Sequence, residues 1–171
     1  ESFSVYLDLS IYLIAKVPFN MTSRLAIKLM LWLIGAVLLL HSAILVKIIP
    51  YKIIWGGSLE SDTEMYVFEV VSVLTNLFLA VLLLIKGKHL SSFIPIKVLD
   101  ILLWAFLILF GINTLGNIFA ESLFEKSLSL LTLIFTYLIW IILKGTKKNN
   151  KTQTKKIKIN ILRSQKPRHL K

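Results

Sequence analysis

Apolar residues in this chain gather in four long runs separated by short polar connections. The runs cover residues 25–49, 65–85, 98–118 and 127–143. Each is close to the roughly 20 residues that a helix needs to cross a hydrocarbon core of about 30 Å. The runs lack the strict alternation of a strand, and a backbone in lipid must satisfy its polar groups within its own segment. The pattern therefore predicts an all-α polytopic membrane protein with a bundle of four transmembrane helices.

Turn-forming residues separate the runs and indicate where the helices end. They are Pro50 and the Gly56–Gly57 pair, then Gly87 and Pro95, and finally Gly145 after the fourth run. The predicted organisation is a four-helix transmembrane domain over 21–145, followed by a basic tail over 146–171. Residues 1–20 have a shorter apolar stretch interrupted by Asp8. We interpret them as an interfacial helix, an upstream segment or an added cloning segment.

The composition supports membrane embedding, and the charge distribution predicts an orientation. Hydrophobic residues make up 56% of the chain, and cysteine is absent, which excludes disulfides, thiolate metal sites and thiol redox chemistry. The net charge of +11 lies entirely in Lys144–Lys171, where eleven bases meet no acid. Bases also flank the start of the first span and the second connection, whereas acids gather in the other connections. The positive-inside rule then predicts that both termini are cytoplasmic, in a plasma or inner membrane.

The basic tail follows directly after a membrane helix, which favours an orientation signal or a patch for anionic lipid headgroups. We expect no nucleic-acid partner. Membrane lipids are the expected surroundings of the four spans. A homo- or hetero-oligomer is compatible with the sequence.

Polar side chains inside the spans are the candidates for function. Glu69, Ser72 and Asn76 share one face of the second helix, because they are three and four residues apart. The other three helices also place polar groups in the outer half, which predicts a polar, outward-opening pocket near the bundle axis. The outer connection either caps this pocket or only anchors at the interface. The predicted ligand-binding residues are Glu69, His41, Asn76, Asn113, Asn117, Ser72, Thr132 and Trp55.

An acid within a span needs a partner or a proton, because an unpaired charge there costs at least about 2.5 to 3.5 kcal/mol. His41 is the predicted partner of Glu69, since it is the ionisable residue at a similar depth in another span; Lys47 is the second candidate. Such a pair can bind a ligand, relay protons or lock two helices together. For Asp100 we predict a local ion pair with Lys97.

Motifs that would identify a reaction are missing from the sequence. We find no phosphate-binding loop, no HExxH and no nucleophile elbow, and three histidines are too few for a histidine-rich metal site. We predict no catalytic residue, metal or cofactor, and favour a protein that is not an enzyme. The leading hypothesis is binding of a small amphipathic or lipid-like ligand. The alternatives are a structural or assembly subunit, then a proton-coupled transporter or an isomerase of a lipophilic substrate.

Overall fold

The computed structural model describes residues 21–51, 61–92, 94–120 and 123–164. Over these residues it forms the helices α2 (Ser23–Leu45), α4 (Asp62–Lys86), α5 (Ile96–Phe119) and α6 (Leu123–Ser164). Each holds a stretch long and apolar enough to span a membrane, which in α6 is Phe124–Gly145. The protein is therefore an all-α, multi-pass membrane protein, as its sequence predicts. Residues 1–20 and Trp55 lie outside the described residues.

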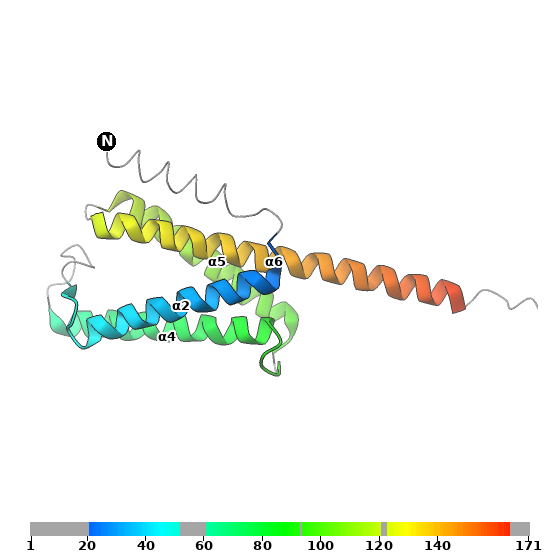
Figure 1. Ribbon diagram of the computed structural model, residues 1–171, viewed down its shortest axis with the longest axis horizontal. Coiled ribbons are helices and arrows are strands. Elements are labelled where there is room, and N and C mark those ends of the chain that lie inside the picture. Colours follow the sequence, from blue (N-terminus) through cyan, green and yellow to red (C-terminus); the bar gives the residue numbers. More distant parts are fainter. Residues whose placement is uncertain (1–20, 52–60, 93, 121–122, 165–171) are drawn as a thin grey trace, which may run out of the picture.

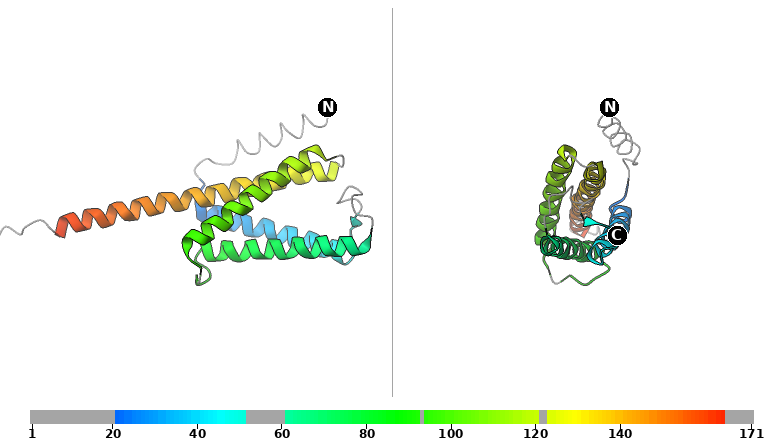
Figure 2. Two further views of the ribbon diagram at one scale, coloured as in Figure 1. Left: turned by 180° about the vertical axis from the view of Figure 1, so that it is seen from behind. Right: turned by 90° about the vertical axis from the view of Figure 1, so that its left-hand side faces the viewer.

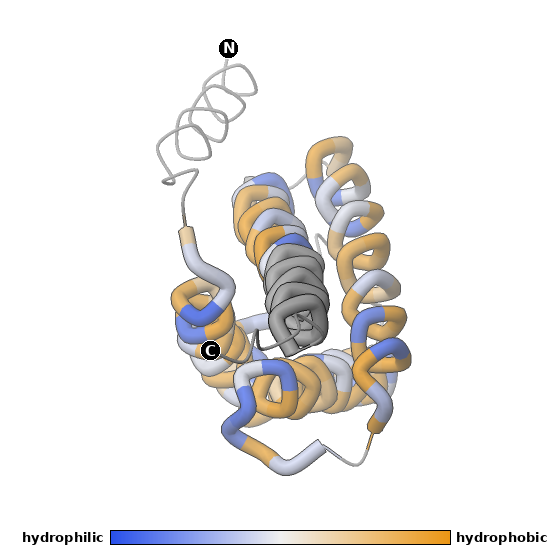
Figure 3. The backbone as a smooth tube through the Cα atoms, turned by 90° about the vertical axis from the view of Figure 1, so that its right-hand side faces the viewer, coloured by the Kyte–Doolittle hydropathy of each residue, from blue (hydrophilic) through white to orange (hydrophobic). Residues whose placement is uncertain are grey.

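The helices form two antiparallel hairpins, α2 with α4 and α5 with α6 (Figure 1). We call the end where α4 is followed by α5 and α6 continues onward the tail end, and the opposite end the Glu69 end. The hairpins cross at the tail end and diverge toward the Glu69 end (Figures 1 and 2). Viewed along the bundle, the helices are mostly hydrophobic (Figure 3).

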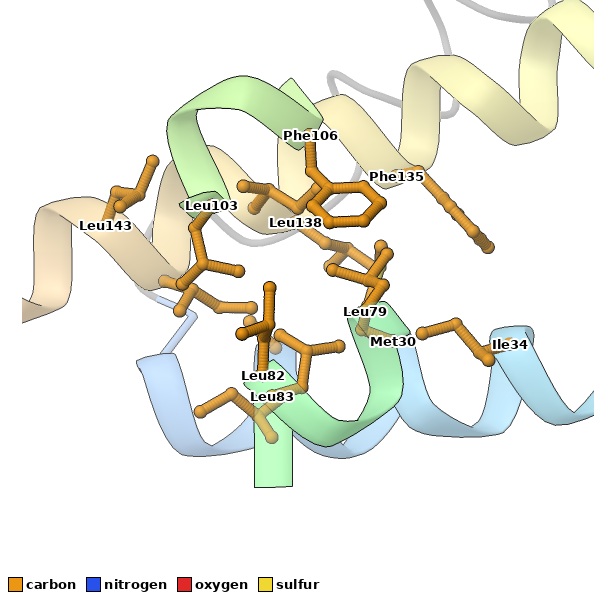
Figure 4. Close-up of a cluster of buried hydrophobic side chains, with 14 of the residues drawn as sticks. Met30, Ile34, Leu79, Leu82, Leu83, Leu103, Phe106, Phe135, Leu138 and Leu143 are labelled. Atoms are coloured by element: carbon orange, nitrogen blue, oxygen red, sulfur yellow. The ribbon is translucent and has the colours of Figure 1, made fainter. Parts of the chain in front are cut away.

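The main apolar core lies in the tail half of the bundle. Met30, Leu79, Leu103 and Ile139 are each fully buried there, and all four helices contribute to the cluster (Figure 4). Toward the Glu69 end the buried apolar cluster is small and centres on Ile44 and Met65. Burial of apolar side chains therefore joins the two hairpins mainly in the tail half.

Three pairs of contacts define how α2 and α4 face each other. From the Glu69 end inward they are Lys47 with Asp62, Ile44 with Met65, and His41 with Glu69. The buried positions Met65, Glu69, Asn76, Leu79 and Leu83 of α4 are three, four or seven residues apart, which is the spacing of a helix seam. We call this contact line the α2–α4 seam. Continued seven residues further along both helices from the His41–Glu69 pair, the same register places Asn76 level with Ile34.

The end of the first helix differs from the prediction, and that of the second agrees with it to one residue. The first helix ends at Leu45 rather than at Ile49, because Lys47 adopts a positive φ of 59° and reverses the chain. The amide of Lys47 donates to the Ile44 carbonyl at 2.8 Å and that of Ile48 to Ala43 at 2.9 Å, a Schellman turn. Lys88, with φ 63°, ends α4 in the same way. Glycine is the usual residue at this position of the turn, and both helices have a lysine there instead.

The fourth helix is longer than predicted. We expected a turn at Gly145, but α6 continues through this residue to Ser164, 42 residues in all (Figure 1). Gly145 instead allows a close approach to the start of α2, since a Cβ there would lie 2.7 Å from the Cβ of Ser23. The part of the tail from 146 to 164 thus continues α6 as a helix beyond the bundle.

Candidate functional site

Glu69 and His41 form the central polar contact of the α2–α4 seam. Glu69 lies two turns into α4 and is fully buried, whereas the side chain of His41 is 16% exposed. The distance from Glu69 Oε2 to His41 Nδ1 is 2.6 Å. The predicted pairing of these two side chains is thus confirmed, and the carboxylate faces α2 rather than lipid. Burial at this depth requires such a partner, because an unpaired charge is costly in hydrocarbon.

The ring nitrogen that contacts Glu69 determines which nitrogen of His41 is left for another hydrogen bond. Glu69 engages Nδ1, so Nε2 is the ring nitrogen that remains for a ligand or for water. A carboxylate held on one ring nitrogen fixes the orientation of the imidazole, as it does in catalytic and metal-binding histidines. His41 therefore presents a fixed polar atom at the edge of a buried acid.

Asn76 continues the polar face of α4 toward the middle of the span. Its side chain is 8% exposed, and its Nδ2 donates to the carbonyl of Ser72 at 2.9 Å. The amide oxygen Oδ1 is buried and accepts no hydrogen bond from the described residues. The orientation of the amide is decided by Ser72, because only a nitrogen can donate to that carbonyl. An unsatisfied buried acceptor is unusual and costs stability.

A second polar contact lies in the α5–α6 hairpin. Thr114 Oγ1 donates to the carbonyl of Phe110 at 2.7 Å and lies 2.9 Å from Thr132 Oγ1. Thr114 is buried, and we did not predict it as a site residue. The sequence spacing could have identified it, because Thr114 follows the buried residues Leu103, Phe106 and Phe110 at the same steps of three or four residues. The nearby Phe110 and Phe135 rings pack edge to face.

The predicted site residues therefore fall into separate groups. His41, Ser72 and Asn76 share the α2–α4 seam with Glu69, whereas Thr132 belongs to the α5–α6 contact. Asn117 is half-buried, and Asn113 is exposed on the outside of α5, so the structure does not bring Asn113 to the acid. A groove on α2 contains none of them; it is lined by Lys28, Leu31, Trp32, Gly35, Ala36 and Leu39.

Ion pairs secure both ends of the bundle. Lys47, the second candidate for Glu69, instead lies 2.5 Å from Asp62, and this hydrogen bond raises the pKa of the lysine. The predicted Asp100–Lys97 pair is wrong, because Asp100 pairs with Lys86 of α4. Lys86 is almost completely buried, so its ammonium needs the carboxylate across the helix contact more than the exposed Lys97 does.

Comparison of the chain with protein-family models, with curated proteins and with solved structures finds no match. Among the described residues, no three histidines or acids gather as metal ligands would. What the arrangement offers is one buried acid, one oriented imidazole and one unsatisfied amide oxygen along a single helix seam.

Proposed function

We propose that this membrane protein binds a small amphipathic or lipid-like molecule through the Glu69–His41 pair. The observation that carries the proposal is the complete burial of Glu69, 2.6 Å from a histidine that is 16% exposed. Neutral polar side chains link membrane helices with about 0.6 to 2 kcal/mol per bond. An acid performs the same linkage at a desolvation cost of at least about 2.5 kcal/mol, which favours a role in binding.

The arrangement of the helices supports entry from the Glu69 end. Apolar side chains fill the tail half, whereas the buried apolar cluster toward the Glu69 end is small (Figure 4). A path lined by polar groups across the whole bundle is what a transporter would need, so the apolar tail half supports binding rather than transport. With the positive-inside rule, the Glu69 end faces outward and the basic tail lies in the cytoplasm, beside the plasma or inner membrane.

The test is to identify small molecules that co-purify with gently solubilised protein by mass spectrometry. The comparison uses the wild type, Glu69→Gln, and Glu64→Gln, in which an exposed acid of the same helix is neutralised. We expect a molecule that the wild type and Glu64→Gln retain and that Glu69→Gln loses. Circular dichroism should show the same helix content in all three. Equal small-molecule content in the three proteins would contradict the proposal.

The length of α6 favours a second candidate, a structural or assembly subunit. Residues 146–164 continue the helix beyond the bundle and carry seven bases and no acid. At about 1.5 Å per residue they extend about 28 Å, which suits an acidic protein partner better than headgroups at the membrane surface. Truncation after Gly145 separates the candidates. A binding protein keeps its small molecule, whereas an assembly subunit loses a cross-linked partner.

A further inference from the structure

The groove on α2 runs along one half of the span, on the side of the helix that faces away from the core. Its volume is about 650 Å³, and it extends from Lys28 to Leu39. This length is about 16 Å at about 1.5 Å per residue. One leaflet is half of a hydrocarbon core about 30 Å thick. The groove therefore has the length of the hydrocarbon part of one leaflet.

The middle of the groove is apolar and open. Nothing lies within 4 Å of the position that a Cβ on Gly35 would take, so no side chain fills the groove there. Trp32 lines the groove and is 81% exposed. An open apolar channel between side chains of a membrane helix accepts a hydrocarbon chain.

Positive charge gathers where the groove meets the tail end. Arg24 and Lys28 are one turn apart on α2, both are exposed, and neither pairs with an acid among the described residues. The acid that the described residues place at this end, Asp100, pairs with Lys86. Lys28 lies about 8 Å inside the start of α2 at about 1.5 Å per residue, and a lysine this close to a helix end extends to the interface. The groove thus leads from an apolar channel to two cations at headgroup level.

The start of α2 also lies against α6. The backbone of Gly145 approaches Ser23 closely, at the point where α6 leaves the bundle (Figure 1). This contact brings Lys144, which is exposed, to the same end as Arg24 and Lys28. The tail end of α2 therefore carries an excess of positive charge.

We propose that the groove binds one anionic phospholipid from the leaflet at the tail end. One acyl chain lies along Gly35 beside Trp32, and the headgroup phosphate lies at Lys28 and Arg24. A zwitterionic lipid fills the channel equally well but brings no net charge to the two cations. The site is on the outer face of α2 and is independent of the proposed function of the Glu69–His41 pair.

Charge disfavours a second copy of the chain as the occupant. All copies insert into the membrane in one orientation, so a symmetric pair has its two-fold axis along the membrane normal. Contact through the groove would then place Lys28 of both copies at the same depth, facing each other across the axis. Like charges repel there, whereas a lipid phosphate supplies the opposite charge.

Trp32 is the reporter for the experiment. Trp55, Trp104 and Trp140 are replaced by phenylalanine in the full chain, which is then placed in nanodiscs of phosphatidylcholine with a fixed minority of phosphatidylglycerol. Bromine atoms, which quench tryptophan fluorescence on contact, are carried on the acyl chains of one lipid or the other. We expect phosphatidylglycerol to be preferred at Trp32 by about fivefold for each cation, and the preference to fall with added salt. A protein that keeps only Trp104, which is exposed on α5, should show no preference.

Two substitutions test the two parts of the site separately. Lys28→Gln should lower the preference about fivefold, and Lys28→Arg should keep it. Gly35→Leu fills the channel without meeting another side chain and should abolish the preference, although both cations remain. Gly116→Leu, at a glycine on α5 that is also open, should change nothing. Glu69→Gln should also leave the preference intact, so the result is separate from the co-purification test.

Equal quenching by the two brominated lipids would overturn the inference, as would an unchanged preference in Gly35→Leu. A second copy in the groove would shield Trp32 from both lipids. Because the chain has no cysteine, Gly35→Cys would then form a disulfide between copies, and that result would also overturn the inference. If the protein with Trp32 alone does not assemble, native mass spectrometry decides. The wild type should retain one phosphatidylglycerol that Lys28→Gln loses, and equal retention would contradict the site.

Discussion

Replacing Asn76 with leucine should make the isolated protein more stable. The amide oxygen of Asn76 is buried without a hydrogen bond from the described residues, and such an atom costs about 1 to 3 kcal/mol. Leucine has the same number and branching of side-chain heavy atoms as asparagine and removes this cost. The substitution also loses the Asn76 Nδ2 bond to the Ser72 carbonyl, worth about 0.5 to 1.5 kcal/mol. The net expectation is a gain of about 1 kcal/mol in the free energy of unfolding.

A matched control isolates this effect. Asn113→Leu is the same substitution at an exposed position within α5, so it includes the same gain in helix propensity without relieving a buried acceptor. Both variants would be unfolded reversibly in mixed micelles of mild detergent and dodecyl sulfate. We expect Asn76→Leu to exceed Asn113→Leu by about 1 kcal/mol. A loss of more than about 1 kcal/mol in Asn76→Leu would refute the reasoning, because it would mean that the oxygen has a partner.

Two further predictions concern how the hairpins are joined. Gly145→Ala should destabilise the bundle by about 1 kcal/mol or more, because the new Cβ would lie 2.7 Å from the Cβ of Ser23. The control is Gly116→Ala, where a Cβ meets open space. It should be neutral or stabilising in the same unfolding assay. Lys86→Met should destabilise the protein by leaving Asp100 unpaired, and adding Asp100→Asn should recover part of the loss. Strict additivity of the last two substitutions would show that the ion pair contributes nothing.

The sequence predicts the helices well because span length and hydropathy are local properties. The His41–Glu69 pairing was also predictable. An acid within a span needs a partner, and the depth of each residue along its helix follows from the residue number. Features that depend on contacts between helices were not. Gly145 resembles a turn residue until Ser23 is placed against it, and the choice of Lys86 over Lys97 by Asp100 depends on how α4 meets α5.

The placement of Asn113 depends on its rotation about the axis of α5 as well as on its depth. Depth puts this residue at the level of other polar groups, but its rotation about α5 exposes it on the outside of the bundle. The heptad-like spacing of Leu103, Phe106 and Phe110 points to Thr114 instead, which is buried. Rotation, unlike depth, is decided by which residues bury the largest apolar area against the neighbouring helix.

The distribution of polar contacts indicates how the site can admit a ligand. The polar contacts His41–Glu69 and Thr114–Thr132 each lie inside one hairpin, whereas Lys86–Asp100 joins the two hairpins at the tail end. Apolar side chains join the hairpins in the tail half, and Phe124 of α6 packs against the Ile44–Met65 cluster toward the Glu69 end. Apolar contacts in lipid resist sliding less than hydrogen bonds do, because lipid tails can replace them. Because the His41–Glu69 contact lies within one hairpin, a change in the packing between the hairpins does not by itself require this contact to break.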